Sequence, residues 1–238
     1  MLSDPAPFAA REALYLAVRA REGRLYSDAE VRLLPYVPAS HPLDAEWRVR
    51  QRSGERLRRH LRRRGRPLRV LDLGCGNGWL AHSLTQTGHT VAAVDLNRTE
   101  LEQGARVFGT KPDLQFLYAD VFEARLPLTD LDAVVVAAAV QYFPDVRALL
   151  ERLLTLLRPG GEIHLLDSPF YTPRTVAAAR DRTRAYYAEL GFAEMAAGYY
   201  HHLSHEIATF KAVERNRAWY HRWPGPTPPF PWYLITKP

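Results

Sequence analysis

The chain has 238 residues and a formal net charge of +6, with 47% hydrophobic and 24% charged residues. This composition is ordinary for a folded globular protein, and the length suits one domain with an added segment. No run of about 18 apolar residues is present, so we expect no membrane-spanning helix. Cys75 is the single cysteine, which excludes an intramolecular disulfide and a cysteine-rich zinc site.

The positive charge comes almost entirely from arginine, since only Lys111, Lys211 and Lys237 are lysines among the 32 basic residues. Together with the abundant alanine, this favours a general bias toward arginine over an adaptation to an acidic partner. Asp4 and Glu12 lie where a signal peptide would be apolar. We therefore expect a cytoplasmic protein.

Two helices are predicted before the first strand. The stretch from Phe8 to Glu22 is rich in Ala, Leu and Arg, and Gly23 follows it as a stop signal. After Pro42, residues 44–64 have the apolar spacing of a second, longer helix. We expect residues 1–66 to form an N-terminal helical segment.

From residue 67 onward, short apolar runs alternate with helical stretches, which is typical of βαβ units. Residues 133–140 are apolar almost throughout and suit a strand covered on both faces of a parallel sheet. The strand candidates are residues 69–73, 91–94, 114–118, 131–139 and 162–167. The prediction for residues 67–238 is an α/β domain with a doubly wound, mostly parallel sheet.

Several helix ends in this domain can also be predicted. Thr99 and Glu102 have the spacing of a capping box. Asp145 is placed to cap a helix with strong apolar periodicity, and Pro159-Gly160-Gly161 would end it. A further helix is expected over residues 173–190.

Residues 191–238 are rich in aromatic residues and proline. Nine aromatic residues lie between 199 and 233, and five prolines between 224 and 231 oppose regular structure there. Residues 232–236 would form a closing strand. The aromatic residues suit either a plain core or the lining of an acceptor pocket, and we expect this segment on the substrate side of the domain.

The most informative segment is residues 70–78, in which an apolar strand runs into glycines at three alternate positions, Gly74, Gly76 and Gly78. Glycine is needed where the backbone turns tightly or where a ligand lies directly against it. A glycine turn alone is weak evidence, so its surroundings decide its meaning.

Acidic residues accompany this turn at the ends of neighbouring strands. Asp95 ends the second strand, where its carboxylate can accept both hydroxyls of a ribose. Asp120 follows the third strand, where a carboxylate can accept from an adenine amino group. With Asp72 in the first strand, these acids mark the crevice in which such sheets bind ligands.

A dinucleotide-binding oxidoreductase is the main alternative for this motif. Its fingerprint is Gly-x-Gly-x-x-Gly, whereas Trp79 stands at the third glycine position here. That fingerprint also makes no use of an acid at Asp72. A glycine turn without any ligand is the other alternative.

Over residues 68–170 the chain resembles the class I S-adenosylmethionine-dependent methyltransferases. Residues 71–78 are similar to their first motif, Asp95 to the ribose-binding acid and Asp120-Val121 to the adenine-contacting pair. Residues 131–145 resemble the fourth-strand motif, and residues 157–161 the turn before strand five. The resemblance implies a Rossmann-like fold, S-adenosylmethionine as cofactor and S-adenosylhomocysteine as its product.

The resemblance also assigns roles to single residues. Cys75 and the three glycines would lie under the methionine part of the cofactor, with Asp72 orienting the turn. Leu96 and Val121 would flank the adenine. Arg52, in the helix before the sheet, could pair with the cofactor carboxylate or lie on the surface.

The sequence departs from the family after strand four. Ala137 stands where many members have Asn or Ser, and Gln141 where His is frequent. Backbone contacts of Ala137 to the cofactor are compatible with this change, but the polar contacts that the family makes to a substrate are not expected there. Gln141, Tyr142, Tyr171 and the His201–His205 cluster, with His201 foremost, are the candidates for acceptor contacts.

His201 and His205 are four residues apart and would share one helical face, a spacing that can hold a metal. A base in the substrate pocket and structural histidines are the alternatives. The overall prediction includes no metal.

The methyl group on a sulfonium is already activated, so the protein need supply only alignment and electrostatics, and a general base depends on the acceptor. Cys75 lies inside the glycine turn, which argues against the cysteine nucleophile of C5-pyrimidine methylation. The Asn/Asp-Pro-Pro-aromatic motif of base-amino methyltransferases is also missing after strand four.

These features predict in-line methyl transfer to a small-molecule acceptor at O, N or C, with the N-terminal helices capping the cofactor. Two alternatives stay open. One is an RNA or other nucleic-acid methyltransferase that uses the eight arginines from Arg56 to Arg69, although this run also suits the solvated face of a helix. The other is a non-catalytic cofactor-binding partner subunit.

Overall fold

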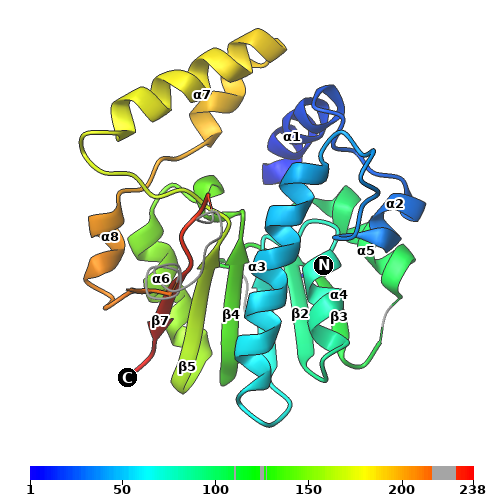
Figure 1. Ribbon diagram of the computed structural model, residues 1–238, viewed down its shortest axis with the longest axis vertical. Helices are drawn as coiled ribbons and strands as arrows, with labels where there is room; N and C mark the ends of the chain where they lie inside the picture. Colours follow the sequence, from blue (N-terminus) through cyan, green and yellow to red (C-terminus); the bar gives the residue numbers. More distant parts are fainter. Residues whose placement is uncertain (110, 124–125, 127, 216–228) are drawn as a thin grey trace.

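The computed structural model describes residues 1–109, 111–123, 126, 128–215 and 229–238. Its centre is a seven-stranded sheet in the order β3-β2-β1-β4-β5-β7-β6 (Figure 1). The first five strands are parallel, and β7 runs antiparallel to both of its neighbours. The strands are β1 (Arg69–Leu73), β2 (Thr90–Asp95), β3 (Leu114–Tyr118), β4 (Leu131–Ala137), β5 (Leu157–Leu166), β6 (Val213–Glu214) and β7 (Tyr233–Thr236).

Helices cover both faces of the sheet, as a doubly wound fold requires. One apolar core joins the sheet to α3, α4 and α5, and a second joins it to α6 and α8. The helices are α1 (Ala9–Arg21), α2 (Asp28–Leu33), α3 (Asp44–Arg62), α4 (Trp79–Thr85), α5 (Arg98–Phe108), α6 (Val146–Leu156), α7 (Val176–Leu190) and α8 (Ser204–Ala208), with short 3₁₀ helices η1 (Ala6–Phe8), η2 (Val140–Tyr142) and η3 (Ala193–Gly198). The predicted fold class is confirmed.

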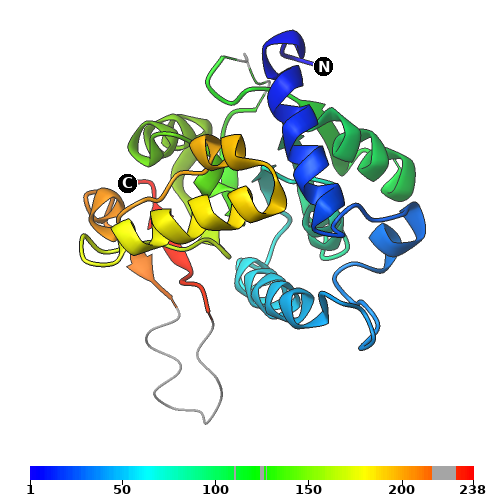
Figure 2. The same cartoon turned by 90° about the horizontal axis from the view of Figure 1, so that it is seen from above.

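Two helices lie above the carboxyl edge of the sheet. Seen from the side and from above, α1 lies over the half that carries β1 and β2, and α7 over the half that carries β4 and β5 (Figures 1 and 2). None of the described helices is both long and apolar enough to cross a bilayer.

The predicted end of α6 was wrong. The helix ends at Leu156 and β5 begins at once, so Pro159-Gly160-Gly161 lies inside a strand. The reason is tertiary: Gly160 N–H donates to Lys237 O at 3.0 Å, and Lys237 N–H donates to Gly161 O at 2.9 Å. Lys237, the residue after β7, thus pairs with backbone groups that a local turn would otherwise leave free.

The capping residue of α5 also differs from the prediction. Asn97, not Thr99, is the N-cap, and its side chain accepts from Glu100 N–H at 3.0 Å. The Thr99 hydroxyl instead donates to Glu12 of α1 at 3.0 Å. The predicted N-cap of α6 was right, because the Asp145 side chain accepts from the backbone N–H groups of both Arg147 and Ala148.

The aromatic C-terminal segment is described in part. Trp219, Tyr220 and Trp223 lie outside the described residues. Trp232 is buried in the core beneath α3, and its indole N–H donates to His164 at 3.3 Å. The predicted closing strand is present as β7.

Candidate cofactor site and active site

Two adjoining cavities lie at the carboxyl edge of the sheet. The wide cavity, about 340 Å³, lies over the ends of β1, β2 and β3 and beneath α1. The narrow cavity, about 100 Å³, lies between the glycine turn, the ends of β4 and β5, and helices α1 and α3. Both are lined by Tyr15, Gly74, Gly76, Glu100 and Ala138, so together they form one elongated site.

The glycine turn forms the floor where the two cavities meet. Gly74 and Gly76 have φ angles of 73° and 54°, which disfavour other residues. A Cβ at Gly74 would lie 2.4 Å from Cβ of Ala139, and one at Gly78 would lie 2.4 Å from Phe116. The turn is therefore wedged between β3 and the end of β4, and its bare backbone is exposed to the cavities.

Asp95 holds the turn in place from the end of β2. Its carboxylate accepts from Gly76 N–H at 2.7 Å and from Asn97 N–H at 2.8 Å. The side chain lines the wide cavity, and burial raises its pKa. Each oxygen keeps a second acceptor position, which suits the two hydroxyls of a ribose.

The far end of the wide cavity is apolar, with one acid at its margin. Leu96, Val121 and Phe143 line it, and Asp120 lies beside them. The Asp120 side chain accepts from Phe122 N–H at 2.9 Å, which orients the carboxylate. These walls fit a flat aromatic ring with a polar edge, such as adenine.

Asp72 is the clearest sign that the narrow cavity binds a ligand. Its side chain is buried, and Oδ2 has no hydrogen-bond partner among the described residues. Burial and the nearby Asp95 raise the pKa of Asp72 to about 7. Buried polar atoms are normally paired, so an ammonium group in the cavity would satisfy this oxygen.

Three arginines line the same cavity: Arg19, Arg24 and Arg50. Arg50 lies over the ring of Trp47 at 4.9 Å and pairs with Glu46 at 2.6 Å, so its guanidinium is fixed. A fixed guanidinium beside an unpaired acid matches the carboxylate and ammonium of an amino-acid moiety. The residues present therefore fit S-adenosylmethionine at both ends.

Arg52 lies elsewhere. It is exposed on α3 and lines neither cavity. A separation of two residues corresponds to more than half a turn of an α-helix, so the side chains of Arg50 and Arg52 lie on different sides of α3. The sequence signal that could have identified Arg50 is its position three residues after the buried Trp47.

Two further acids were not singled out from the sequence. Glu100 lines both cavities, and burial together with Asp95 raises its pKa to about 7. Asp167 follows β5 at the same edge, with its φ at 52°, and accepts from the Ser53 hydroxyl at 2.6 Å. Burial raises the pKa of Asp167 to about 6. The available signal for Asp167 was its position as an acid at the end of an expected strand.

Of the candidates for acceptor contacts, Tyr142 lies in the site. It lines the wide cavity, its hydroxyl accepts from Arg19 at 3.2 Å, and its ring meets that of Tyr15 edge-on at 5.8 Å. Gln141 is buried with both ends of its amide engaged, by Ala138 O at 2.7 Å and by Ser168 at 3.2 Å. Its side chain thus supports the loop after β4 and lines neither cavity.

The histidine segment lies outside both cavities. His201 interacts with the Thr183 hydroxyl at 2.9 Å and packs against Tyr171. Helix α8 begins at Ser204, so His201 and His205 do not share the predicted helical face. The spacing that suggested a metal is therefore not realised as a helical pair.

Another histidine cluster joins α3 to β5. His60 Nε2 lies 2.9 Å from Glu162, which also pairs with Arg64, and His164 Nε2 lies 3.4 Å from the same carboxylate. Because Nδ1 of His164 accepts from the Trp232 indole, its Nε2 carries the proton and is not free to bind a metal. This cluster is a buried polar connection between the helix and the sheet.

Comparison with known proteins matches this architecture. The model of the family described as "Methyltransferase domain" matches residues 70–161. An uncharacterized methyltransferase of Mycobacterium tuberculosis is 39% identical over 104 residues, which are 44% of this chain and 51% of that protein. The tRNA 5-carboxymethoxyuridine methyltransferase of Escherichia coli is 32% identical over 103 residues, 42% of this chain and 40% of that protein. The chain thus spans about half the length, or less, of these curated relatives.

A solved structure extends the fold match to most of the chain. Magnesium protoporphyrin IX methyltransferase from Synechocystis, with bound S-adenosylmethionine, has a TM-score of 0.57 and 14% identity over 93% of this chain and 97% of that one. The matched motifs, the strand order and the glycine turn agree with one another. Residues 70–161 thus match a methyltransferase domain, and the chain has the Rossmann-like fold of S-adenosylmethionine-dependent methyltransferases.

Proposed function

We propose that the protein transfers the methyl group of S-adenosylmethionine to a small-molecule acceptor by in-line displacement at O, N or C. The observation that carries this proposal is the single elongated site formed by the two cavities. A turn of bare backbone lies at its middle, the buried carboxylate of Asp95 on one side, and an unpaired acid with fixed guanidinium groups on the other. The bound cofactor supplies an activated methyl group on a sulfonium.

The chain's own residues would bind and orient the reactants. Asp95 would accept from the ribose hydroxyls, and Leu96 with Val121 would enclose the adenine. Asp72 and Arg50 would take the ammonium and carboxylate of the methionine part. With both ends held, the reacting carbon is fixed relative to the acceptor, and alignment of this kind lowers the barrier by several kcal/mol.

The cover of the site supports a small acceptor. Phe8 and Tyr15 of the N-terminal segment and Met195 of η3 close the wide cavity from above. Arg11 donates to Tyr142 O at 2.7 Å and to Gly198 O at 3.5 Å, which connects the two sides of this cover. A covered space of this size admits a small molecule more readily than a base within a folded nucleic acid.

The substitution Asp95→Ala tests the proposal. It removes a charged acceptor for two hydroxyls, so we expect cofactor affinity to fall about 10- to 100-fold by titration calorimetry. Asp181→Ala, which removes an exposed acid on α7, is the control and should bind as the parent does. Unchanged affinity in a folded Asp95→Ala protein would contradict the assignment.

Turnover separates catalysis from cofactor binding alone. The parent protein should form S-adenosylhomocysteine from S-adenosylmethionine when it is offered a panel of hydroxyl, amine and carbon acids. Tight cofactor binding with no product on any acceptor would favour the alternative of a non-catalytic partner subunit.

A further inference from the structure

The outer face of α3 carries a row of arginines that the proposed methyl transfer does not use. Trp47, Leu57 and Leu61 pack this helix against the sheet, so its other side faces outward. The exposed arginines on that side are Arg48, Arg52, Arg59, Arg62 and Arg63. Arg50, by contrast, faces the narrow cavity, so one helix serves two surfaces.

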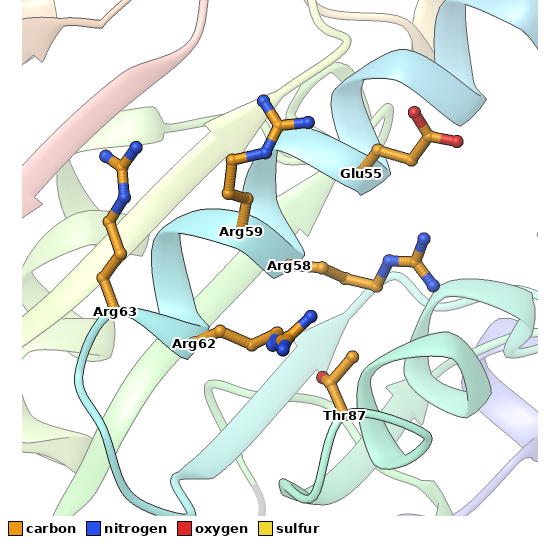
Figure 3. Close-up of a pocket in the computed structure, with 6 residues that line it drawn as sticks. All are labelled: Glu55, Arg58, Arg59, Arg62, Arg63 and Thr87. Atoms are coloured by element: carbon orange, nitrogen blue, oxygen red, sulfur yellow. The ribbon is translucent and has the colours of Figure 1, made fainter.

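The row ends in a hollow at the C-terminal end of α3. This hollow has a volume of about 550 Å³ and is lined by Glu55, Arg58, Arg59, Arg62, Arg63 and Thr87. Figure 3 shows Arg58 and Arg62 extending on the side of the helix that faces Thr87, while Arg59 and Arg63 extend from the adjacent side. Four guanidinium groups thus border one open space.

In the folded protein, some arginines of this run pair with acids of the sheet and others do not. Arg64 pairs with Glu162, and Arg66 pairs with Asp132, so these two connect the helix and the following loop to the sheet. Within the described part of the chain, Arg58, Arg59, Arg62 and Arg63 have no hydrogen-bond or ion-pair partner. The one carboxylate of the hollow, on Glu55, already accepts from Gln51 at 2.9 Å.

Four guanidinium groups beside one carboxylate leave the hollow with an excess of positive charge, which attracts a polyanion. Guanidinium groups match phosphate oxygens in pairs, and phosphate contacts dominate the affinity of nucleic-acid binding. From Arg52 to Arg63 the helix extends roughly 16 Å. One nucleic-acid strand carries a charge about every 3.4 Å along a helical axis, so this length matches several phosphates.

We propose that the outer face of α3 and the hollow at its end bind the sugar–phosphate backbone of a single-stranded nucleic acid. A single row of guanidinium groups matches one strand better than the two strands of a duplex. A lipid surface fits less well, because none of the exposed large hydrophobic residues among those described lies on α3. We call the outer face of α3 together with this hollow the arginine track. The inference goes beyond the proposed methyl transfer, since the track and the cofactor site lie on different sides of the helix.

Fluorescence anisotropy with a labelled 20-nucleotide RNA of mixed sequence, and with the DNA of the same sequence, tests the proposal. We expect binding that weakens with KCl, with a slope of about −3 in a plot of log K against log salt for four phosphate contacts. Replacement of Arg58, Arg59, Arg62 and Arg63 by Gln should weaken binding at least tenfold and bring the slope toward zero. The matched control replaces Arg174, Arg180, Arg182 and Arg184, all exposed on or before α7, by Gln and should retain binding and slope.

The control distinguishes binding at a defined site from non-specific attraction to the net charge of the protein, because both variants lose four positive charges. Equal weakening in the two variants, or no binding by the parent, would overturn the proposal. So would displacement of the strand by polyglutamate at equal charge concentration, or a preference for anionic lipid vesicles over the oligonucleotides. Binding of RNA and DNA alike, or of RNA alone, supports it, and the second outcome assigns a contact to the 2′-hydroxyl.

Methyl transfer to the oligonucleotide is measured separately, with labelled S-adenosylmethionine. No incorporation, together with arginine-dependent binding, supports a track distinct from the methyl acceptor. Label in the strand would also support the track, but would make nucleic acid the acceptor and overturn the small-molecule part of the proposed function. The two proposals can therefore fail independently.

Discussion

At the scale of single residues, the narrow cavity sets guanidinium groups opposite carboxyl groups. Arg19 and Arg50 lie on the helices above it, and Asp72 and Asp167 lie at the strand ends below it. An amino-acid moiety carries one group of each sign, so it can bridge the two sides. The position of each charge, more than the number of charges, decides what this cavity binds.

A pair of arginine substitutions checks that argument. Arg50→Gln removes a fixed guanidinium from the narrow cavity, and we expect cofactor affinity to fall about tenfold or more by calorimetry. Arg52→Gln, two residues away on the exposed side of α3, should bind the cofactor as the parent does. A larger loss for Arg52→Gln than for Arg50→Gln would reverse the proposed orientation of the cofactor carboxylate.

The acids of the site predict a pH dependence of cofactor binding. Burial raises the pKa of Asp72 and Glu100 to about 7 and that of Asp167 to about 6, so all three are partly protonated near pH 6. A cationic ligand favours their charged forms and lowers their pKa values. Binding should therefore release protons, and affinity should rise from pH 5.5 to 7.5 and then level off.

Calorimetry in two buffers of different ionisation enthalpy measures this proton release directly. Asp72→Asn should bind more weakly at pH 7.5 and show a smaller release near pH 6.5. Affinity that is flat or falls across this range would show that the buried acids do not face the charges of the cofactor.

At the scale of elements, α1 is a cover held by one small apolar cluster and by polar contacts. Val18 is its only buried residue, and it packs with Tyr187 of α7 and Met195 of η3. Tyr186 of α7 donates to Glu22 at 2.5 Å, Arg19 donates to Tyr142, and Glu12 accepts from Thr99 of α5. A helix with so little buried apolar surface opens at low free-energy cost.

We predict that cofactor binding closes this cover. Backbone amides of residues 12–21 should exchange with solvent rapidly in the free protein and at least tenfold more slowly with saturating S-adenosylhomocysteine, because the ligand adds contacts to α1. Hydrogen–deuterium exchange with mass spectrometry measures this, and α6, which lines neither cavity, provides the internal control. Equal slowing in both helices would indicate global stabilisation and not closure of α1.

The boundaries of elements show where local sequence signals were sufficient. Asp145 was recognised as a cap because its side chain satisfies backbone donors two and three residues ahead. Thr99 has the same local pattern, but β2 ends at Asp95, and the helix begins two residues earlier than Thr99 would allow. Where two capping patterns overlap, the position of the preceding strand decides between them.

At the scale of the whole molecule, the fold determines which arginines between Arg56 and Arg69 form ion pairs within the protein. Arg64 and Arg66 meet acids on β5 and β4 that lie about 100 and 66 residues away along the chain. Arg58, Arg59, Arg62 and Arg63 meet none in the described part of the protein. The sequence shows eight similar residues. Only the fold separates Arg64 and Arg66, which pair with acids, and Arg56, which lies over the Trp232 ring, from the arginines available to a partner.

The sequence alone determined the sheet and the glycine turn, because strand burial, helix periodicity and the need for left-handed glycines are local properties. The glycine turn, Asp72, Asp95, Asp120 and Tyr142 all lie where strand order predicts, at one edge of a parallel sheet. Only the tertiary structure decided that Arg50 and not Arg52 reaches the site, that Asp167 and Glu100 join it, and that Gln141 is occupied elsewhere. Each of these depends on how α1, α3 and the strand ends pack together, and packing between distant segments is not encoded in any local pattern.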